Sequence, residues 1–255
     1  MSILQPRRTA AVHNTLAIAK RELRGYFASP VGYVFIVIFV AAAGALPFYV
    51  GGFFQRGEAT LESFFIFHPW LYLLLIPAVA MRLWAEERKS GTIELLMTLP
   101  VSSVETVIGK FLAAWTFIVV ALAFTFPMWI TVNVLGQPDN GVIAASYIGS
   151  LLLAGAFLAI GSCMSALTNN QAVAFILAAA ACFLMTMSGL DLVLDAVRRL
   201  TPAAVVEFVA GLSFLDHFRT ITKGVVDLRG LIFFLSTIVF WLFATVVTLD
   251  VRRAR

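Results

Sequence analysis

The sequence predicts an all-α integral membrane protein, a bundle of transmembrane helices forming one domain. Of its 255 residues, 61% are hydrophobic and 13% are charged. Soluble domains carry about 45–50% apolar and about 25% charged residues, so a soluble chain of this composition would lack polar groups to cover its surface. The apolar runs show no alternation, whereas strands of a membrane barrel alternate over about 9–11 residues. The spans are therefore helices.

Six runs approach the roughly 20 apolar residues that cross a bilayer core. Their interiors hold no Asp, Glu, Lys, Arg or His. Ion-coupled carriers normally place ionisable groups there, so the uncharged spans disfavour a secondary transporter. Pro47, Pro77 and Pro127 lie inside spans and are expected to kink them. Cys163 and Cys182 lie within spans, as small packing residues. The predicted spans are 31–50, 69–83, 111–135, 142–167, 172–190 and 231–249.

Lysine and arginine set the orientation. With six spans both termini share one side, which then holds twelve of the basic residues against six on the other side. Cytoplasmic loops carry the excess of Lys and Arg, so we expect both termini in the cytoplasm. A cleaved signal peptide is the less favoured alternative, because thirty residues precede the first apolar run.

Residues 11–29 are predicted to form an interfacial helix before the first span. Leu16, Ala19, Leu23 and Phe27 fall on one face at helical spacing. Cationic side chains accompany this face, as in helices that lie in the headgroup plane; they are Lys20, Arg21 and Arg24. Ser29-Pro30 then turns the chain into the first span. The alternative is a cytoplasmic extension of the first transmembrane helix.

The cytoplasmic segment 82–110 combines charges with apolar residues. Ser90-Gly91 ends one helix, and Thr92 is a suitable N-cap for a short helix that Pro100 stops. Ser102 and Ser103 can cap the next helix. The short helix has an apolar face, which packs either on the chain's own helix ends or in a groove of a cytoplasmic partner. The residues themselves leave both possibilities open.

The long external segment 191–229 is moderately apolar, and we expect two short helices there that dip back toward the membrane or lie on its outer face. They would form either a lid on the bundle or a gate or platform for an extracytoplasmic partner. Asp216, His217 and Arg219 are adjacent, but one His with one Asp is too little for a catalytic or metal site. Gly161-x-x-x-Ser165 is a small-xxx-small pattern, which is weak evidence for a dimer face.

Three segments resemble one known family in matching order. The loop EERKSGTIELLMTLPVS (86–102), the N-terminal KRELRGYFASPVGY (20–33) and LSFLDHFRTITKGVVDLRGLIFF (212–234) resemble ABC-2-type ABC transporter permeases. The branch related to the gliding-motility permease is the most similar. The resemblance covers nearly the whole chain.

The resemblance implies a role for each segment. The region 86–100 would hold the coupling helix, which docks on a cytoplasmic ATPase subunit, and charges beside it would fix its register. By resemblance the coupling residues are Glu86, Glu87, Gly91, Thr92, Glu94, Leu95 and Leu96. The N-terminal helix would be the connecting helix near the ATPase, and the helices before the last span would be re-entrant. The family assembles two permease protomers, as a homodimer or heterodimer, with two ATPase subunits in the bacterial inner membrane.

The chain lacks the nucleotide-binding pattern G-x-x-x-x-G-K-[ST], so ATP and Mg²⁺ would be bound by the partner and this chain is not expected to be an enzyme. The expected function is the membrane subunit of an ATP-driven transporter. The alternative is a non-transporting scaffold or mechanotransmitter that links a cytoplasmic ATPase to an extracytoplasmic complex.

Overall fold

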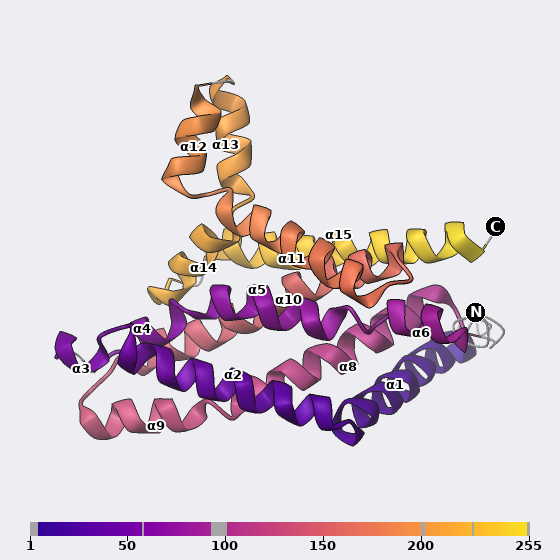
Figure 1. The fold of residues 1–255 in the computed structure, drawn as a ribbon, viewed down its shortest axis with the longest axis horizontal. Helices are drawn as coiled ribbons and strands as arrows, with labels where there is room; N and C mark the ends of the chain where they lie inside the picture. Colours follow the sequence, from indigo (N-terminus) through magenta and orange to yellow (C-terminus); the bar gives the residue numbers. More distant parts are fainter. Residues whose placement is uncertain (1–4, 58, 93–100, 200–201, 226, 254–255) are drawn as a thin grey trace.

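The computed structural model describes residues 5–57, 59–92, 101–199, 202–225 and 227–253 and contains no strand among them. Long helices run roughly along one axis, and shorter helices lie at the two ends (Figure 1). The helices are α1 (Gln5–Ala28), α2 (Pro30–Tyr49), α3 (Phe53–Arg56), α4 (Glu62–Phe65), α5 (His68–Ala80), α6 (Ala85–Ser90), α8 (Ser103–Ala123), α9 (Phe126–Leu135), α10 (Asn140–Leu167), α11 (Gln171–Met187), α12 (Asp191–Arg198), α13 (Ala203–Gly211), α14 (Phe214–Thr222) and α15 (Leu228–Arg253).

Helix α10 forms the centre of the bundle, where it packs against α5, α8, α11, α14 and α15. Small residues allow this close approach. A Cβ atom built on Gly161 would lie 2.4 Å from the Cβ of Ala80 in α5. The Gly161-x-x-x-Ser165 pattern therefore serves packing inside one protomer, and its interpretation as a dimer face is wrong.

Within the residues that the structure describes, five helical segments are long and apolar enough to cross a membrane. They are Pro30–Gln55, Glu62–Ser90, Ser103–Leu135, Asn140–Leu167 and Leu228–Arg252. The predicted span 172–190 corresponds to α11, which has 17 residues. At about 1.5 Å per residue α11 covers roughly 26 Å, less than a hydrocarbon core of about 30 Å. Helix length alone thus supports five spans and not six.

Helix α11 nevertheless runs back along the bundle after α10 (Figure 1). Helix α1 begins and α15 ends at the same end, marked N and C in Figure 1. Helix α11 follows α10 at that end and carries the chain toward the opposite end before α12 begins (Figure 1). The termini consequently lie on one side of the bundle, as predicted.

The third predicted span is broken. Helix α8 ends at Ala123 and α9 begins at Phe126, with Pro127 in the first turn of α9. A proline without an N–H donor fits a first turn, so Pro127 starts a helix and does not kink one. Pro47 and Pro77 do lie inside α2 and α5.

Polar side chains inside the bundle form hydrogen bonds between helices. Tyr72 of α5 shares a hydrogen bond of 2.8 Å with Ser150 of α10, and the Ser150 hydroxyl lies 3.1 Å from Nδ1 of His68. His68 is completely buried, one residue before the start predicted for its span. Hydrogen bonding is what makes such buried polar groups tolerable.

The end remote from the termini is more helical than predicted. The segment between α2 and α5 contains α3 and α4, and the described part of segment 191–229 contains three short helices where two were expected. Helix α14 packs on α10 with Phe214, Leu215, Phe218 and Ile221 buried. Helices α12 and α13 instead form a hairpin that projects sideways from the bundle (Figure 1). The segment therefore combines a packed lid with a projecting arm.

Substitution of Gly161 by Ala tests the packing of α10. The added methyl group would meet Ala80, and overpacking of this kind costs about 1–3 kcal/mol. We expect a lower melting temperature for the purified protein in detergent. Gly25→Ala is the control, because a Cβ there has nothing within 4 Å and Ala suits a helix better than Gly. Equal melting temperatures for the two variants would contradict the packing described.

Candidate functional site

The charged segment predicted to carry function lies at the end of the bundle that holds the termini (Figure 1). Helix α5 ends at Ala80, and α6 begins at Ala85 after a short turn. Gly91 ends α6 in the left-handed conformation, at φ +74°. The break predicted at Ser90-Gly91 is therefore present, and glycine is the residue that adopts this conformation without strain.

A serine of α10 satisfies the backbone at the turn between α5 and α6. The Ser165 hydroxyl accepts hydrogen bonds from the backbone N–H groups of Trp84 (3.2 Å) and Ala85 (3.1 Å). It donates to the carbonyl of Met81 at 3.0 Å. The indole N–H of Trp84 also donates to Ser162 at 3.0 Å. Because the first N–H groups of a helix lack partners in the helix, these contacts fix the start of α6 to α10.

The side chain of Lys110 in α8 is buried among three helices, with 2% of its surface exposed. Its ammonium lies 2.7 Å from a carboxylate oxygen of Glu87 in α6 and 3.1 Å from one of Glu22 in α1. It also lies 5.4 Å from the centre of the Trp84 ring. A buried charge is tolerated only when it is paired, so Lys110 holds α1, α6 and α8 together.

Glu22 is ionised in this arrangement. Burial alone would raise the pKa of its carboxyl group, but the charges of Lys110 and Arg21 outweigh burial and hold the pKa below its ordinary value. Arg21 contributes an ion pair of 2.7 Å on the exposed side. The buried ammonium thus faces two carboxylates.

Helix α1 packs along α8. A Cβ on Gly109 would lie 2.9 Å from the side chain of Ile18, and the rings of Tyr26 and Phe117 stack at 5.0 Å. Helix α8 starts with a capping box formed by Ser102 and Glu105. The predicted cap at Ser102 is therefore confirmed. The Glu105 carboxylate also accepts a hydrogen bond from Asn14 of α1 at 3.3 Å.

The side of α1 that packs differs in part from the predicted one. Leu16, assigned to the apolar face, is 58% exposed, whereas Ile18 and Tyr26 contact α8. Helix α1 packs against α8, so its buried side differs from the side that would have faced lipid headgroups. The basic residues of the helix are exposed; they are Lys20, Arg21 and Arg24.

The structure divides the predicted coupling residues into two groups. Glu87 lies in the buried cluster, whereas Glu86 is exposed and 3.9 Å from Arg82. Gly91 and Thr92 are exposed, and the Thr92 hydroxyl donates to the carbonyl of Glu87 at 3.3 Å. The remaining predicted residues, and the short helix expected after Thr92, lie in 93–100, outside the described residues; they are Glu94, Leu95 and Leu96.

Sequence reasoning missed the partners of Glu87. Lys110 and Glu22 lie 23 and 65 positions from Glu87 in the chain, so no local spacing relates them. One signal was available, because Lys110 stands at the apolar start of a span and Glu22 is the one acid among the basic residues of KRELR. Through the contacts of Trp84, Ala85 and Glu87, residues 84–92 link α5 to α1, α8 and α10, and we call this segment with its contacts the joint.

Lys110→Met tests this joint. The variant leaves Glu22 and Glu87 without their shared cation, which should lower the free energy of unfolding by on the order of 3 kcal/mol. A lower melting temperature of the purified protein measures the loss. Lys89→Met is the matched control, because Lys89 is exposed in the same segment. If both variants melt alike, Lys110 does not hold the joint.

The cluster also predicts a pH dependence. Since the folded protein lowers the pKa of Glu22 below the ordinary 4.5, its ion pairs stabilise the fold fully above about pH 4.5 and lose this effect as the pH falls through the folded value. We expect the melting temperature of wild type to exceed that of Glu22→Gln at neutral pH. This difference should become smaller as the pH is lowered. A difference that grows as the pH falls would contradict this.

A family model described as "ABC-2 family transporter protein" matches residues 16–249, a range that begins in α1 and ends in α15 and includes the whole joint. No curated protein matches. The model describes the family as a whole, so the resemblance to the gliding-motility branch stays a prediction. The chain belongs to the ABC-2 family of transporter proteins and is a multi-pass membrane permease subunit.

Proposed function

We propose that this chain is the membrane subunit through which a separate ATPase moves transmembrane helices. Membership of the ABC-2 permease family implies a cytoplasmic ABC ATPase partner in general. The observation that carries the proposal is the buried contact of Lys110 with Glu22 and Glu87. We expect a force applied just beyond Gly91 to reach α1, α8 and α10, because the ion pairs of Lys110 and the hydrogen bonds of Ser165 connect the joint to these helices.

The topology proposed has six membrane crossings with both termini in the cytoplasm of a bacterium, in its inner membrane. The five long apolar segments, the course of α11 back along the bundle (Figure 1) and the distribution of Lys and Arg support it. Helix α11 is the shortest pass, and the bilayer can thin around a short helix at modest cost. The joint then lies at the cytoplasmic surface.

Docking and transmission fall to different residues in this proposal. Residues 86–100 would dock on the ATPase, with exposed Glu86 and Thr92 at the surface, together with Glu94, Leu95 and Leu96. Glu87 would support the docking segment from inside, since its carboxylate is already engaged by Lys110. Two such protomers would pair with two ATPase subunits, which bind ATP and Mg²⁺. The exposed Lys20, Arg21 and Arg24 would lie near anionic headgroups beside the ATPase.

A scaffold that does not translocate anything is the second candidate. The projecting α12–α13 hairpin favours it, because Phe208 and Val205 are 68% and 41% exposed there. Such an arm could hold an extracytoplasmic partner and pass movement of the bundle to it. Substrate density between two protomers would decide for transport.

Affinity purification of the tagged chain from its native membrane tests the coupling. Wild type should retain an ABC ATPase subunit and ATP hydrolysis. We expect Glu94→Lys to lose the ATPase, and Gly91→Val to weaken coupling because Val tolerates φ +74° poorly. Arg198→Ala, in the projecting helix α12, is the control. The coupling claim fails if both variants keep ATPase binding and hydrolysis at wild-type levels.

Glu87→Gln separates transmission from docking. This variant weakens the contact with Lys110 but leaves the exposed residues of the segment unchanged. We expect it to retain the ATPase while the permease-dependent part of ATP hydrolysis falls several-fold. Loss of the ATPase itself would place Glu87 in the docking surface instead.

A further inference from the structure

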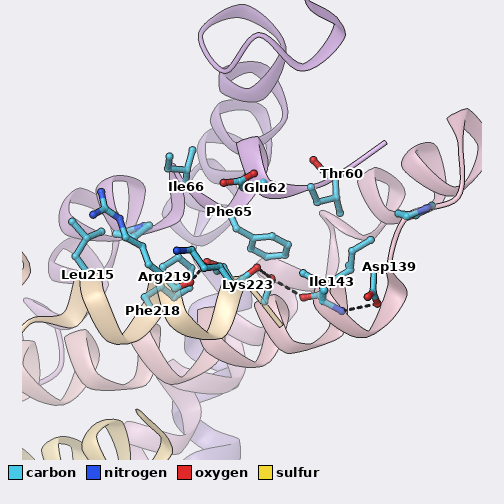
Figure 2. A pocket seen from close by; sticks show the side chains of 16 residues that line it. Thr60, Glu62, Phe65, Ile66, Asp139, Ile143, Leu215, Phe218, Arg219 and Lys223 are labelled. Carbon is cyan, nitrogen blue, oxygen red and sulfur yellow. Dashed lines mark hydrogen bonds between the residues drawn. The ribbon is translucent and has the colours of Figure 1, made fainter. Parts of the chain in front are cut away.

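A cleft of about 610 Å³ opens at the end of the bundle remote from the termini, between α4, the start of α10 and α14 (Figure 2). Its walls are apolar, with Phe65, Ile143 and Phe218 among the lining residues. Charged side chains of both signs stand around these walls (Figure 2). A cleft that is both apolar and charged suits an amphipathic ligand.

The cations come from α14. Arg219 and Lys223 are four residues apart, so they lie on the same side of the helix and both line the cleft. Both are exposed, and neither forms an ion pair with any residue that the structure describes. Two adjacent cations of this kind match the oxygens of a phosphate group.

The anions stand on the other walls and differ in their engagement. Asp139 caps the N-terminus of α10, where its carboxylate accepts hydrogen bonds from the N–H groups of Gly141 (2.9 Å) and Val142 (3.2 Å). Glu62 is exposed and makes no ion pair within the described residues. Glu62 is therefore the carboxylate left to receive a ligand cation.

An apolar stripe leads away from the lip of the cleft along α5. Ile66, Trp70 and Leu74 recur every four residues and are 43%, 43% and 62% exposed. Ile66 also lines the cleft, so the stripe begins there. Tryptophan is enriched at the level of lipid headgroups, which places the cleft at the bilayer surface and the stripe within the bilayer.

We propose that this cleft binds an aminophospholipid, with the phosphate on Arg219 and Lys223, the primary amine toward Glu62, and an acyl chain along Ile66, Trp70 and Leu74. The site is remote from the joint, and its occupation requires only that the chain spans a membrane. It is thus independent of how the permease is coupled to an ATPase.

Native mass spectrometry of the purified permease tests the site, with phosphatidylethanolamine, phosphatidylcholine and phosphatidylglycerol of equal chain length added in turn. All three carry a phosphate, but only phosphatidylethanolamine has a primary amine. We expect it to bind at least about fivefold more tightly than the others, because the amine adds a charge-assisted hydrogen bond. Soluble phosphoethanolamine, which lacks acyl chains, should not displace it at equal concentration.

Variants assign the two halves of the headgroup. Arg219→Ala with Lys223→Ala should weaken phosphatidylethanolamine binding at least about tenfold. Glu62→Gln should instead abolish the preference for phosphatidylethanolamine over phosphatidylglycerol. Arg198→Ala with Arg199→Ala removes two exposed cations elsewhere and should change nothing. Equal binding of the three lipids, or no effect of the cleft variants, would overturn the proposal, as would displacement by phosphoethanolamine.

Discussion

One buried ammonium group organises the end of the molecule that holds the termini. Lys110 lies at the point where α8 enters the bundle, and the energy of leaving its charge unpaired in an apolar environment is large. Glu22 and Glu87 reach it from two other helices. If α1 or α6 moved away, the charge of Lys110 would lose a partner in apolar surroundings. The ion pairs therefore help to hold α1 against α8 and the segment before residue 93 against both helices.

The same end depends on α10 in a second way. The chain must leave helical geometry between Ala80 and Ala85, and the free N–H groups of that turn need partners. The Ser165 hydroxyl accepts hydrogen bonds from two of them and donates one to the carbonyl of Met81. Since α10 is also the central packing helix, these hydrogen bonds attach the turn to the centre of the bundle. The start of α6 is fixed to α10 in this way.

Features governed by local chemistry could be predicted from the sequence. Apolar runs predicted the positions of the long helices, Gly91 predicted the end of α6, and Ser102 predicted the start of α8. The candidate coupling segment came from resemblance, which placed Glu86 and Glu87 together but could not distinguish them. Features governed by distant contacts escaped, because periodicity carries no information about partners. The contact of Glu22 with Lys110, the burial of α14 on α10 and the true packed side of α1 all belong to this kind. The break between α8 and α9 escaped for another reason, since proline fits a first turn as well as a kink.

The burial of Lys110 has a consequence for how the permease responds to ionic strength. Dissolved ions screen exposed charges over a Debye length of about 8 Å at physiological salt but hardly reach a buried pair. Under the proposed coupling, docking through exposed residues such as Glu86 would weaken as the salt concentration rises, whereas the contact between Glu87 and Lys110 would change little. Binding of the proposed ATPase would then depend on ionic strength more strongly than the contact that links α6 to α8.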